Sequence, residues 1–268
     1  MAVTAVVKLG GDVLGGTALC DVAAGIAAAR AAGHRLLVVH GGGPQATALS
    51  KRLGLEPQLV GGRRITDPAT LDVIKMVVAG HLNVDLVAAL RAAGVPAVGI
   101  HGASGVIRAH RRPPRRVSGG GDAPVDFGLV GDVDGFDLAL LATLGEQHLP
   151  VLACLGASER GEVLNINADV VASQLAAALG CDALMAVTAV GGVRRQKDDP
   201  ASRFARLTVA EARAAIAGGI VQGGMIPKLE EAFAPLEAGV GAVHIVGPGE
   251  IATALANPGT VGTVLVAA

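Results

Sequence analysis

A strand-like segment that leads through glycines into a helix occurs twice near the start of the chain, and this repeated unit constrains the fold more than any other feature. Val3–Leu9 and Leu36–His40 are short apolar runs with β-branched residues. Ala18–Ala32 and Pro44–Leu53 have helical patterns, the second with proline in its first turn. Because a helix between two strands allows them to run parallel, the opening predicts a βαβα unit in a parallel sheet.

The alternation continues along the chain. Further helical patterns cover Leu71–Ala79, Leu82–Ala93, Leu138–Gln147, Ala168–Leu179, Val209–Ala217 and Leu229–Ala238. Further strand patterns cover Ala97–Ile100, Val151–Leu155, Val163–Ile166, Ala183–Thr188, Ala242–Val246 and Val261–Val266. We therefore expect an α/β fold with a mostly parallel central sheet and helices on both faces. In such sheets ligands bind at the carboxyl ends of the strands.

The stretch Val106–Phe136 interrupts this alternation. It contains the basic run His110–Arg116, the glycine-rich turn Ser118–Gly121 and the alternating segment Val125–Val133. We expect an irregular, β-rich excursion that carries a loop. Its arginines suit either a phosphate or partner patch or a solvated loop, and the neighbouring Pro-Pro and Gly-Gly-Gly favour the solvated loop.

Composition narrows the classes of protein. The 268 residues are 51% hydrophobic and 17% charged, which is typical of a folded globular protein and not of a disordered one. A net charge of −1, with no Trp, no Tyr and four Phe, makes nucleic-acid binding unexpected. Charges, glycines and prolines interrupt the apolar runs, so no membrane span is expected. Met1–Lys8 resembles a first strand and lacks the basic start of a signal peptide, which favours the cytoplasm.

The three cysteines, Cys20, Cys154 and Cys181, are far apart and odd in number. This spacing indicates neither a disulfide framework nor a zinc site. The simplest interpretation is that they are small apolar residues.

Two glycine-rich turns follow the first two predicted strands, at Lys8–Gly11 and His40–Pro44. Glycines let backbone N–H groups approach an anion, and a helix N-terminus adds partial positive charge. Side by side, the two turns suit the binding of one phosphate. Tight strand-to-helix turns without a ligand have the same composition. The chain contains neither the P-loop motif nor the dinucleotide-binding motif.

Three further segments carry polar groups to predicted element ends. Lys228 follows Gly223–Pro227 at the start of a helix, where a lysine is electrostatically disfavoured unless an anion is present. In Asn165–Asp169, Asn167 or Asp169 is suited either to cap the next helix or to line a site. In Gly61–Asp67, Thr66 or Asp67 is suited to cap a helix, and one of the two arginines is suited to bind a carboxylate through two hydrogen bonds.

Six segments occur in order along nearly the whole chain, namely Lys8–Gly11, His40–Pro44, Gly62–Asp67, Val125–Val133, Asn165–Asp169 and Gly223–Lys228. Together they resemble the motifs of the amino acid kinase family. The resemblance implies a three-layer αβα sandwich and a homodimer. It also implies that residues 1–178 form an N-terminal lobe for an acyl-amino acid and residues 179–268 a C-terminal lobe for ATP.

Within that family the motifs imply transfer of the ATP γ-phosphoryl group to the γ-carboxylate of N-acetyl-L-glutamate, the second step of arginine biosynthesis. Mg²⁺ is expected with ATP, without a dedicated protein site. Two alternatives remain: phosphorylation of carrier-protein-linked aminoadipate in lysine biosynthesis, and a weakly catalytic paralogue that senses amino acids. Compared with the carrier-dependent relatives that these motifs also resemble, Gly62–Arg64, Asn167–Asp169 and Val125–Asp132 favour free N-acetyl-L-glutamate. The basic run His110–Arg116 favours an acidic carrier instead.

The resemblance assigns roles residue by residue. Lys8 and Lys228 flank the transferred phosphoryl group and Asp169 orients both lysines. The residues implied for the acyl-amino acid are Gly42, Gly43, Arg64, Asn165 and Asn167. The residues implied for the nucleotide are Gly10, Gly11, Thr188, Gly191, Gly223 and Gly224. The chain departs from the family pattern at Val84, Ser104 and Ala189, where polar or charged residues are usual.

Overall fold

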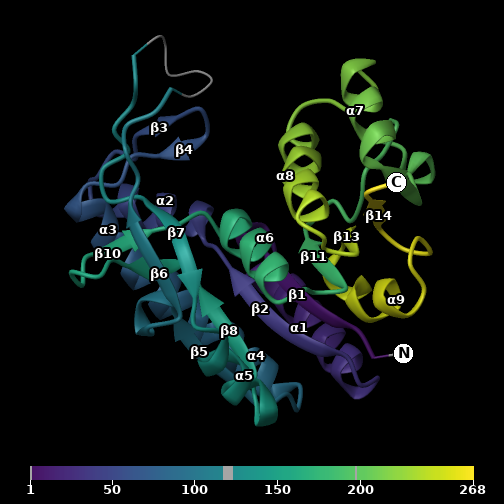
Figure 1. Ribbon diagram of the computed structural model, residues 1–268, viewed down its shortest axis with the longest axis horizontal. Coiled ribbons are helices and arrows are strands. Elements are labelled where there is room, and N and C mark those ends of the chain that lie inside the picture. The colour runs from purple at the N-terminus through teal and green to yellow at the C-terminus, as the bar shows by residue number, and fades with distance from the viewer. Residues whose placement is uncertain (1, 117–122, 197) are drawn as a thin grey trace.

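The computed structural model describes residues 2–116, 123–196 and 198–268 and is built around one eight-stranded sheet (Figure 1). The strand order is β12-β14-β13-β11-β1-β2-β8-β5. Neighbouring strands are parallel except β13 and β14, which are antiparallel, so the predicted mostly parallel sheet is confirmed. The strands are β1 (Thr4–Leu9), β2 (Arg35–His40), β5 (Ala97–His101), β8 (Leu149–Ala153), β11 (Ala183–Val187), β12 (Arg206–Thr208), β13 (Ala242–Val246) and β14 (Thr263–Val266).

Helices cover both faces of this sheet, as the three-layer fold requires. Strand β1 shows the reason: Val7 and Leu9 enter one apolar core, whereas Val6 enters the other, because successive side chains point to opposite faces. Helices α1, α3, α4 and α9 contribute to the first core, and α5 to α8 contribute to the second. The helices are α1 (Gly16–Ala31), α2 (Gly43–Arg52), α3 (Pro68–Ile74), η2 (Lys75–Leu82), α4 (Asn83–Ala92), α5 (Leu138–Gln147), α6 (Ala168–Ala178), α7 (Val209–Ala217), α8 (Met225–Glu237) and α9 (Ile251–Ala256).

The segment Pro68–Ala92 is one continuous helical stretch, not the two helices that the sequence predicts. Wider π-helical turns at Lys75–Leu82 join α3 to α4 where a break was expected. At 25 residues the stretch is long and apolar enough to cross a membrane by length and composition alone, contrary to the expected interruption of every apolar run. Core helices pass the same test, and its residues Leu71, Val78 and Leu86 are buried in the first core. The expectation that the protein does not enter a membrane stays a prediction.

Strands β6 and β7 of the irregular excursion join β9 and β10, from later in the chain, in a second, smaller sheet with the order β10-β9-β6-β7. Its strands are β6 (Ile107–Arg111), β7 (Gly131–Phe136), β9 (Leu155–Ala157) and β10 (Val163–Asn165), and a separate hairpin pairs β3 (Leu59–Val60) with β4 (Arg63–Arg64). The strand expected at Val125–Val133 begins only at Gly131. Ser118–Gly121 lies outside the described residues. The remaining short helices are η1 (Gly11–Val13), η3 (Gly102–Ser104), η4 (Pro200–Ser202) and η5 (Pro248–Glu250).

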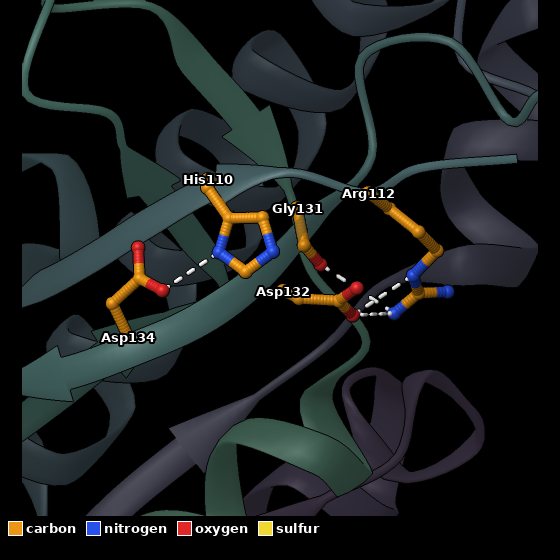
Figure 2. A network of polar contacts seen from close by, with 5 residues as sticks. All are labelled: His110, Arg112, Gly131, Asp132 and Asp134. Carbon is orange, nitrogen blue, oxygen red and sulfur yellow. Dashed lines mark hydrogen bonds and ion pairs between the residues drawn. The ribbon is translucent and has the colours of Figure 1, made fainter.

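The basic run at β6 is not a uniformly solvated loop (Figure 2). Arg112 is only 6% exposed, and its Nε and Nη2 donate to Asp132 Oδ1 at 2.9 and 2.6 Å. His110 Nδ1 lies 2.7 Å from Asp134 Oδ1 on the same sheet. The β6–β7 pairing therefore places acidic residues of one strand opposite basic residues of the other, which the linear sequence does not reveal.

Among the cysteines the apolar interpretation holds for two of three. Cys154 and Cys181 are buried free thiols, and burial raises the pKa of Cys181 to about 11. Cys20, in contrast, is exposed on α1. A raised pKa keeps the buried thiols protonated, so they act as small apolar groups.

Candidate active site

A cleft of about 550 Å³ lies at the carboxyl ends of β1 and β2, where the parallel sheet predicts a ligand site. Its walls come from the two glycine turns, the hairpin strand β4, strand β10 and helices α6 and α8. Nine residues singled out in the sequence line it: Lys8, Gly10, Gly11, Gly42, Gly43, Arg64, Asn165, Asn167 and Asp169. Among the described residues, five singled-out ones do not line this cleft: Thr188, Gly191, Gly223, Gly224 and Lys228.

Lys8 forms a close ion pair with Asp169. Lys8 is the fifth residue of β1 and shares a sheet face with Val6, so its side chain extends toward α6. Its Nζ lies 2.5 Å from Asp169 Oδ1, with side-chain exposures of 14% and 26%. Burial lowers the pKa of Lys8, but the charge and hydrogen bond of Asp169, with the charges of Glu231 and Asp12, together outweigh burial, and the net direction is upward. The cleft therefore contains a permanent ammonium group.

Asn167 explains why Asp169 is free to pair with that lysine. Asn167 is the N-cap of α6, and its Oδ1 accepts a hydrogen bond from the Asp169 backbone N–H at 2.7 Å. Capping is thus done by the amide, and the carboxylate in the first turn faces the cleft. Within the described residues Asp169 has no ion pair with Lys228, so the structure joins the carboxylate to one of the two lysines only.

The two glycine turns lie against each other. Gln45 Nε2, at the start of α2, donates to the Gly11 carbonyl at 2.6 Å. A Cβ on Gly11 would lie 2.6 Å from Gln45 Oε1 and 2.8 Å from Pro44 Cδ. On Gly42 it would lie 2.4 Å from Leu82 Cδ1. A side chain at either position would require Gln45, Pro44 or Leu82 to shift, so packing favours glycine there. A role for the backbone N–H groups of the two glycines in anion binding stays a prediction.

His40 and Asn83 hold the second turn in place, and sequence reasoning missed both. His40 is fully buried, and burial lowers its pKa, so the ring is neutral. Its Nδ1 lies 3.0 Å from the Gly41 carbonyl, and its Nε2 lies 2.9 Å from Asn83 Nδ2. Since a neutral ring has one donor, Nδ1 carries the proton and Nε2 accepts. Asn83 Nδ2 also donates to the Val151 carbonyl at 3.1 Å, which ties the turn to β8. The only signal was a histidine directly before three glycines.

Arg64 presents an unused hydrogen-bond donor. Its Nη2 donates to Thr47 Oγ1 at 2.6 Å and to the Gly43 carbonyl at 3.2 Å, which fixes the guanidinium. Its Nη1 is buried and has no hydrogen-bond partner within the described parts of the chain. A buried cationic N–H without a partner is costly, so this atom suits an anionic ligand. Asn165 Nδ2 is held nearby through Thr66 Oγ1 at 3.1 Å.

Three more arginines line the cleft; the sequence analysis left a binding role open for them but assigned them no place in the site. They are Arg63, Arg112 and Arg115. Burial lowers the pKa of Arg115, and the positive charges of Arg112 and Arg63 lower it further. Arg112 is paired with Asp132, whereas no ion pair is seen for Arg63, Arg64 or Arg115 among the described residues, so the hairpin end of the cleft has more positive than negative charge.

The loop after β11 approaches the first glycine turn from the other side. Asp12 Oδ2 accepts from the Ala189 N–H at 3.0 Å, so the departure from the family pattern at Ala189 still has a polar contact through its backbone. Thr188 is buried, and its Oγ1 accepts from the Gly191 N–H at 3.3 Å. Gly191 has φ +64°, which favours glycine. Of the other departures, Val84 is exposed and Ser104 Oγ contacts the His101 ring.

Helix α8 contributes two charged groups. Lys228 is in its first turn, after Gly223 and Gly224, as the sequence predicts. Glu231 follows one turn later and lines the cleft. Reduced hydration and the Asp169 charge raise the pKa of Glu231, Lys8, Lys228 and Arg63 oppose this rise, and the net result is a pKa of about 7. An acid on an amphipathic helix is normally a solvated residue, so sequence reasoning gave no reason to select it.

A partly buried lysine–aspartate pair and two glycine turns at the carboxyl ends of parallel strands define a class of α/β proteins that bind and transfer phosphate groups. The model of the amino acid kinase family matches residues 3–247. The chain belongs to the amino acid kinase family, and the resemblance of its motifs is confirmed.

Curated relatives are similar over nearly the whole chain. The acetylglutamate kinase of Sorangium cellulosum is 56% identical, covering 97% of this chain and 94% of that protein. The acetylglutamate kinase of Anaeromyxobacter dehalogenans is 55% identical, covering 98% and 99%. Their lengths and this chain's length therefore correspond closely.

Solved structures share the fold. The protein smu.665 of Streptococcus mutans superposes with a TM-score of 0.77 at 27% identity, covering 99% of both chains. N-acetylglutamate synthase of Neisseria gonorrhoeae, in complex with coenzyme A and N-acetyl-glutamate, gives 0.80 at 26% identity, covering 98% of this chain and 59% of that one. Carbamate kinase of Giardia lamblia bound to AMP-PNP gives 0.69 at 19% identity, which bears on the fold alone.

Proposed function

We propose that this chain phosphorylates the γ-carboxylate of N-acetyl-L-glutamate with ATP, producing N-acetyl-L-glutamyl 5-phosphate in the second step of arginine biosynthesis. The observation that carries the proposal is a cleft with the Lys8–Asp169 pair and, on another wall, an unpartnered Arg64 Nη1. These two features suit a substrate with a reacting carboxylate and a second carboxylate. The relatives at 55–56% identity bear the name acetylglutamate kinase.

We assign substrate binding to polar side chains that hydrogen bonds hold in place and to the residues beside them. Arg64 and Asn165 bind the α-carboxylate of the substrate, and Gly42, Gly43 and Asn167 line the space for the acetyl-amino acid. Support comes from the buried Nη1 of Arg64 and from the hydrogen bonds that hold both side chains. A bidentate guanidinium–carboxylate pair is both strong and directional.

The transfer step needs charge neutralisation and alignment, not a base, because the attacking γ-carboxylate is already ionised at neutral pH. Lys8 stabilises negative charge on the phosphoryl oxygens from one side, and Lys228 does so from the other. Asp169 acts by holding the Lys8 ammonium at 2.5 Å, which removes the cost of orienting it during the reaction. The γ-phosphoryl passes from the ATP β-phosphate oxygen to the carboxylate oxygen, and ADP leaves.

ATP is assigned to Gly10, Gly11, Thr188, Gly191, Gly223 and Gly224, around the loop after β11 and the start of α8. Mg²⁺ is proposed as the companion ion that neutralises phosphate charge. Within the residues that the structure describes, no group of three His, Cys, Asp or Glu side chains is arranged to hold a metal. This fits an ion bound mainly by phosphate oxygens and water, which is the usual preference of Mg²⁺.

We further propose that residues 1–178 form the lobe for the acid and residues 179–268 the lobe for ATP, in a cytoplasmic homodimer. Two observations favour an interface between two copies of the chain. Met76 and Val84 are apolar and are 56% and 62% exposed on the long helical segment Pro68–Ala92. Strand β5 is an edge strand of the main sheet.

A coupled assay of ADP release with Mg-ATP tests the function. N-acetyl-L-glutamate is expected to support turnover, whereas L-glutamate, whose α-amino group is charged, is expected to be a poor substrate. The cluster of Arg63, Arg112 and Arg115 favours one competing function, phosphorylation of aminoadipate on an acidic carrier protein. A strong preference for the carrier-linked acid that disappears at high salt would replace our proposal with that one. Tight binding of an amino acid without ADP release would favour the other alternative, a weakly catalytic paralogue that senses amino acids.

A further inference from the structure

Two opposite charges face the cleft from different walls without a direct partner. Arg63 belongs to the β3–β4 hairpin, and Glu231 belongs to α8; both line the cleft. Figure 1 shows the hairpin and α8 on either side of α6, which packs against β1 and α8. Within residues 2–116, 123–196 and 198–268, neither side chain has a hydrogen bond or an ion pair. Arg63 nevertheless lowers the pKa of Glu231, so their charges interact across the cleft.

The other charged groups that act on Glu231 have a different partner, either in the structure or in the proposed function. Lys8, on β1, is paired with Asp169, on α6. Asp169 has the same sign as Glu231 and repels it. Lys228 lies three residues earlier on α8 and, in the proposed function, contacts the phosphoryl group. Of the three described cations that lower the pKa of Glu231, Arg63 is therefore the one that has neither an ion pair in the structure nor a ligand contact in the proposed function.

A free carboxylate beside a phosphate site opposes the binding of ATP unless a cation neutralises it. An ion pair with Arg63 removes that repulsion and pulls α8 toward the hairpin. A guanidinium and a carboxylate form two parallel hydrogen bonds, and excluding water from the cleft strengthens them.

We propose that Arg63 and Glu231 form an ion pair across the cleft when both substrates are bound, and that Glu231 is thereby a positioning residue that holds α8 and Lys228 against the acid-binding wall. The inference rests on the proposed function, because it takes Lys228 as the group that must be positioned. It adds an ion pair between the two walls that the described contacts of Arg63 and Glu231 do not include.

A double-mutant cycle on the full chain tests this pair. The variants are Arg63→Gln, Glu231→Gln and the double variant, and kcat and KM for both substrates are measured at low and high salt. We expect Glu231→Gln to lower kcat about tenfold with little change in the KM for N-acetyl-L-glutamate, as loss of a close charge pair predicts. The double variant should be no slower than the slower single variant, and the coupling should shrink at high salt.

Two controls separate the pair from other roles. Glu230→Gln changes the neighbouring acid, which is exposed and does not line the cleft, and should leave kcat unchanged. Arg63→Lys keeps the charge and should restore part of the kcat lost in Arg63→Gln. Circular dichroism checks that each variant is folded, and Glu231→Asp replaces Glu231→Gln if that variant unfolds.

Independent effects of Arg63→Gln and Glu231→Gln, multiplying in the double variant at both salt concentrations, would overturn the pair. If the wild-type protein releases no ADP with any acid, the proposed function fails instead. The cycle is then measured as the dissociation constant of AMP-PNP in the presence of N-acetyl-L-glutamate. Salt-sensitive coupling in that constant supports the pair, and its absence refutes it.

Discussion

The two walls of the cleft differ in how firmly their polar groups are held. On the wall proposed for the acid, Arg64 and Asn165 each have side-chain hydrogen bonds to neighbouring residues. At the start of α8, beside the wall that Glu231 lines and in the region proposed for the nucleotide, the described contacts of Lys228 include no hydrogen bond or ion pair, and a Cβ on Gly223 or Gly224 would meet no atom within 4 Å. One wall is therefore built before the substrate arrives, whereas the other has room that a ligand can fill.

The difference suggests a division of labour. Preorganised donors stabilise charge without reorganisation during the reaction, which suits a wall that selects one acid. A less constrained wall can move toward the phosphate and away again, which suits exchange of ATP and ADP. The Lys8–Asp169 ion pair lies between the two walls, and its short contact makes it preorganised, as the side chains of Arg64 and Asn165 are.

The largest expected effects come from replacing Lys8 and Lys228, and the two variants should differ in stability. Lys8→Ala and Lys228→Ala should each lower kcat about 10²–10³-fold or more, because each removes a charge needed in the transition state. Only Lys8→Ala should also destabilise the fold, by about 1–3 kcal/mol, because it leaves Asp169 without its cation. Turnover and thermal denaturation check this, with the exposed Lys51→Ala as the control. An equal loss of stability in Lys228→Ala would contradict the contrast between the walls.

A second prediction concerns pH. Asp169 raises the pKa of Lys8 above its usual value, so wild-type Lys8 keeps its charge well into the alkaline range. In Asp169→Asn the burial remains and the counter-charge is lost, so the pKa of Lys8 falls. We expect kcat to drop about tenfold or more near neutral pH and to decline further as pH rises to about 9–10, where the wild-type enzyme stays constant. Parallel pH profiles for the two proteins would show that Asp169 does not act through Lys8.

A third prediction tests the contact between the glycine turns. In Gly11→Ala the new methyl group meets Gln45 and Pro44, which forces the turns apart. We expect kcat to fall about tenfold, since a displacement on the order of 1 Å near the chemistry has effects of up to about 10²-fold. Gly15→Ala is the matched control, because a Cβ there meets nothing within 4 Å and Gly15 has an extended φ of −174°. Unchanged kinetics in Gly11→Ala would mean that the turns need not touch.

The smallest expected effect is the contribution of Glu231, on α8, to the stability of the folded protein. The pKa of Glu231 is about 7 in the folded protein, above its ordinary value of 4.5. Because folding disfavours the ionised form, Glu231 costs stability once pH exceeds the unfolded value, and the cost is fully present above about 7. Glu231→Gln should therefore raise the melting temperature by about 1–2 °C at pH 8 and by nothing at pH 4.5. The side chain is exposed, so the effect is small. Differential scanning fluorimetry, with Glu230→Gln as the control, measures the shift; an equal shift at both pH values would contradict the cause.

Local sequence signals predicted much of the fold. The predicted bounds Leu138–Gln147, Val209–Ala217 and Ala242–Val246 coincide with α5, α7 and β13. Two of these elements begin at a capping side chain that the sequence displays, Asp137 for α5 and Thr208 for α7. Strand β12 and helix α9 were not predicted, because each is short and its pattern is weak.

The site was predicted where its residues lie within recognisable motifs, and missed where tertiary packing placed them. Lys8 and Asp169 are 161 positions apart in the sequence and were singled out from separate motifs, and the structure brings Lys8 Nζ to 2.5 Å from Asp169 Oδ1. Arg112 and Glu231 were not assigned to the site from the sequence, because nothing local distinguishes them from solvated surface residues. Their position in the cleft depends on the β6–β7 register and on the packing of α8 against α6.

The most direct test of the central claim is to trap the acyl phosphate with hydroxylamine during turnover. With N-acetyl-L-glutamate and Mg-ATP, the wild-type protein is expected to form hydroxamate and ADP in equal amounts, and Lys228→Ala is expected to form neither at a measurable rate. ADP release without hydroxamate, or equal hydroxamate formation by Lys228→Ala, would contradict phosphoryl transfer to a carboxylate between the two walls.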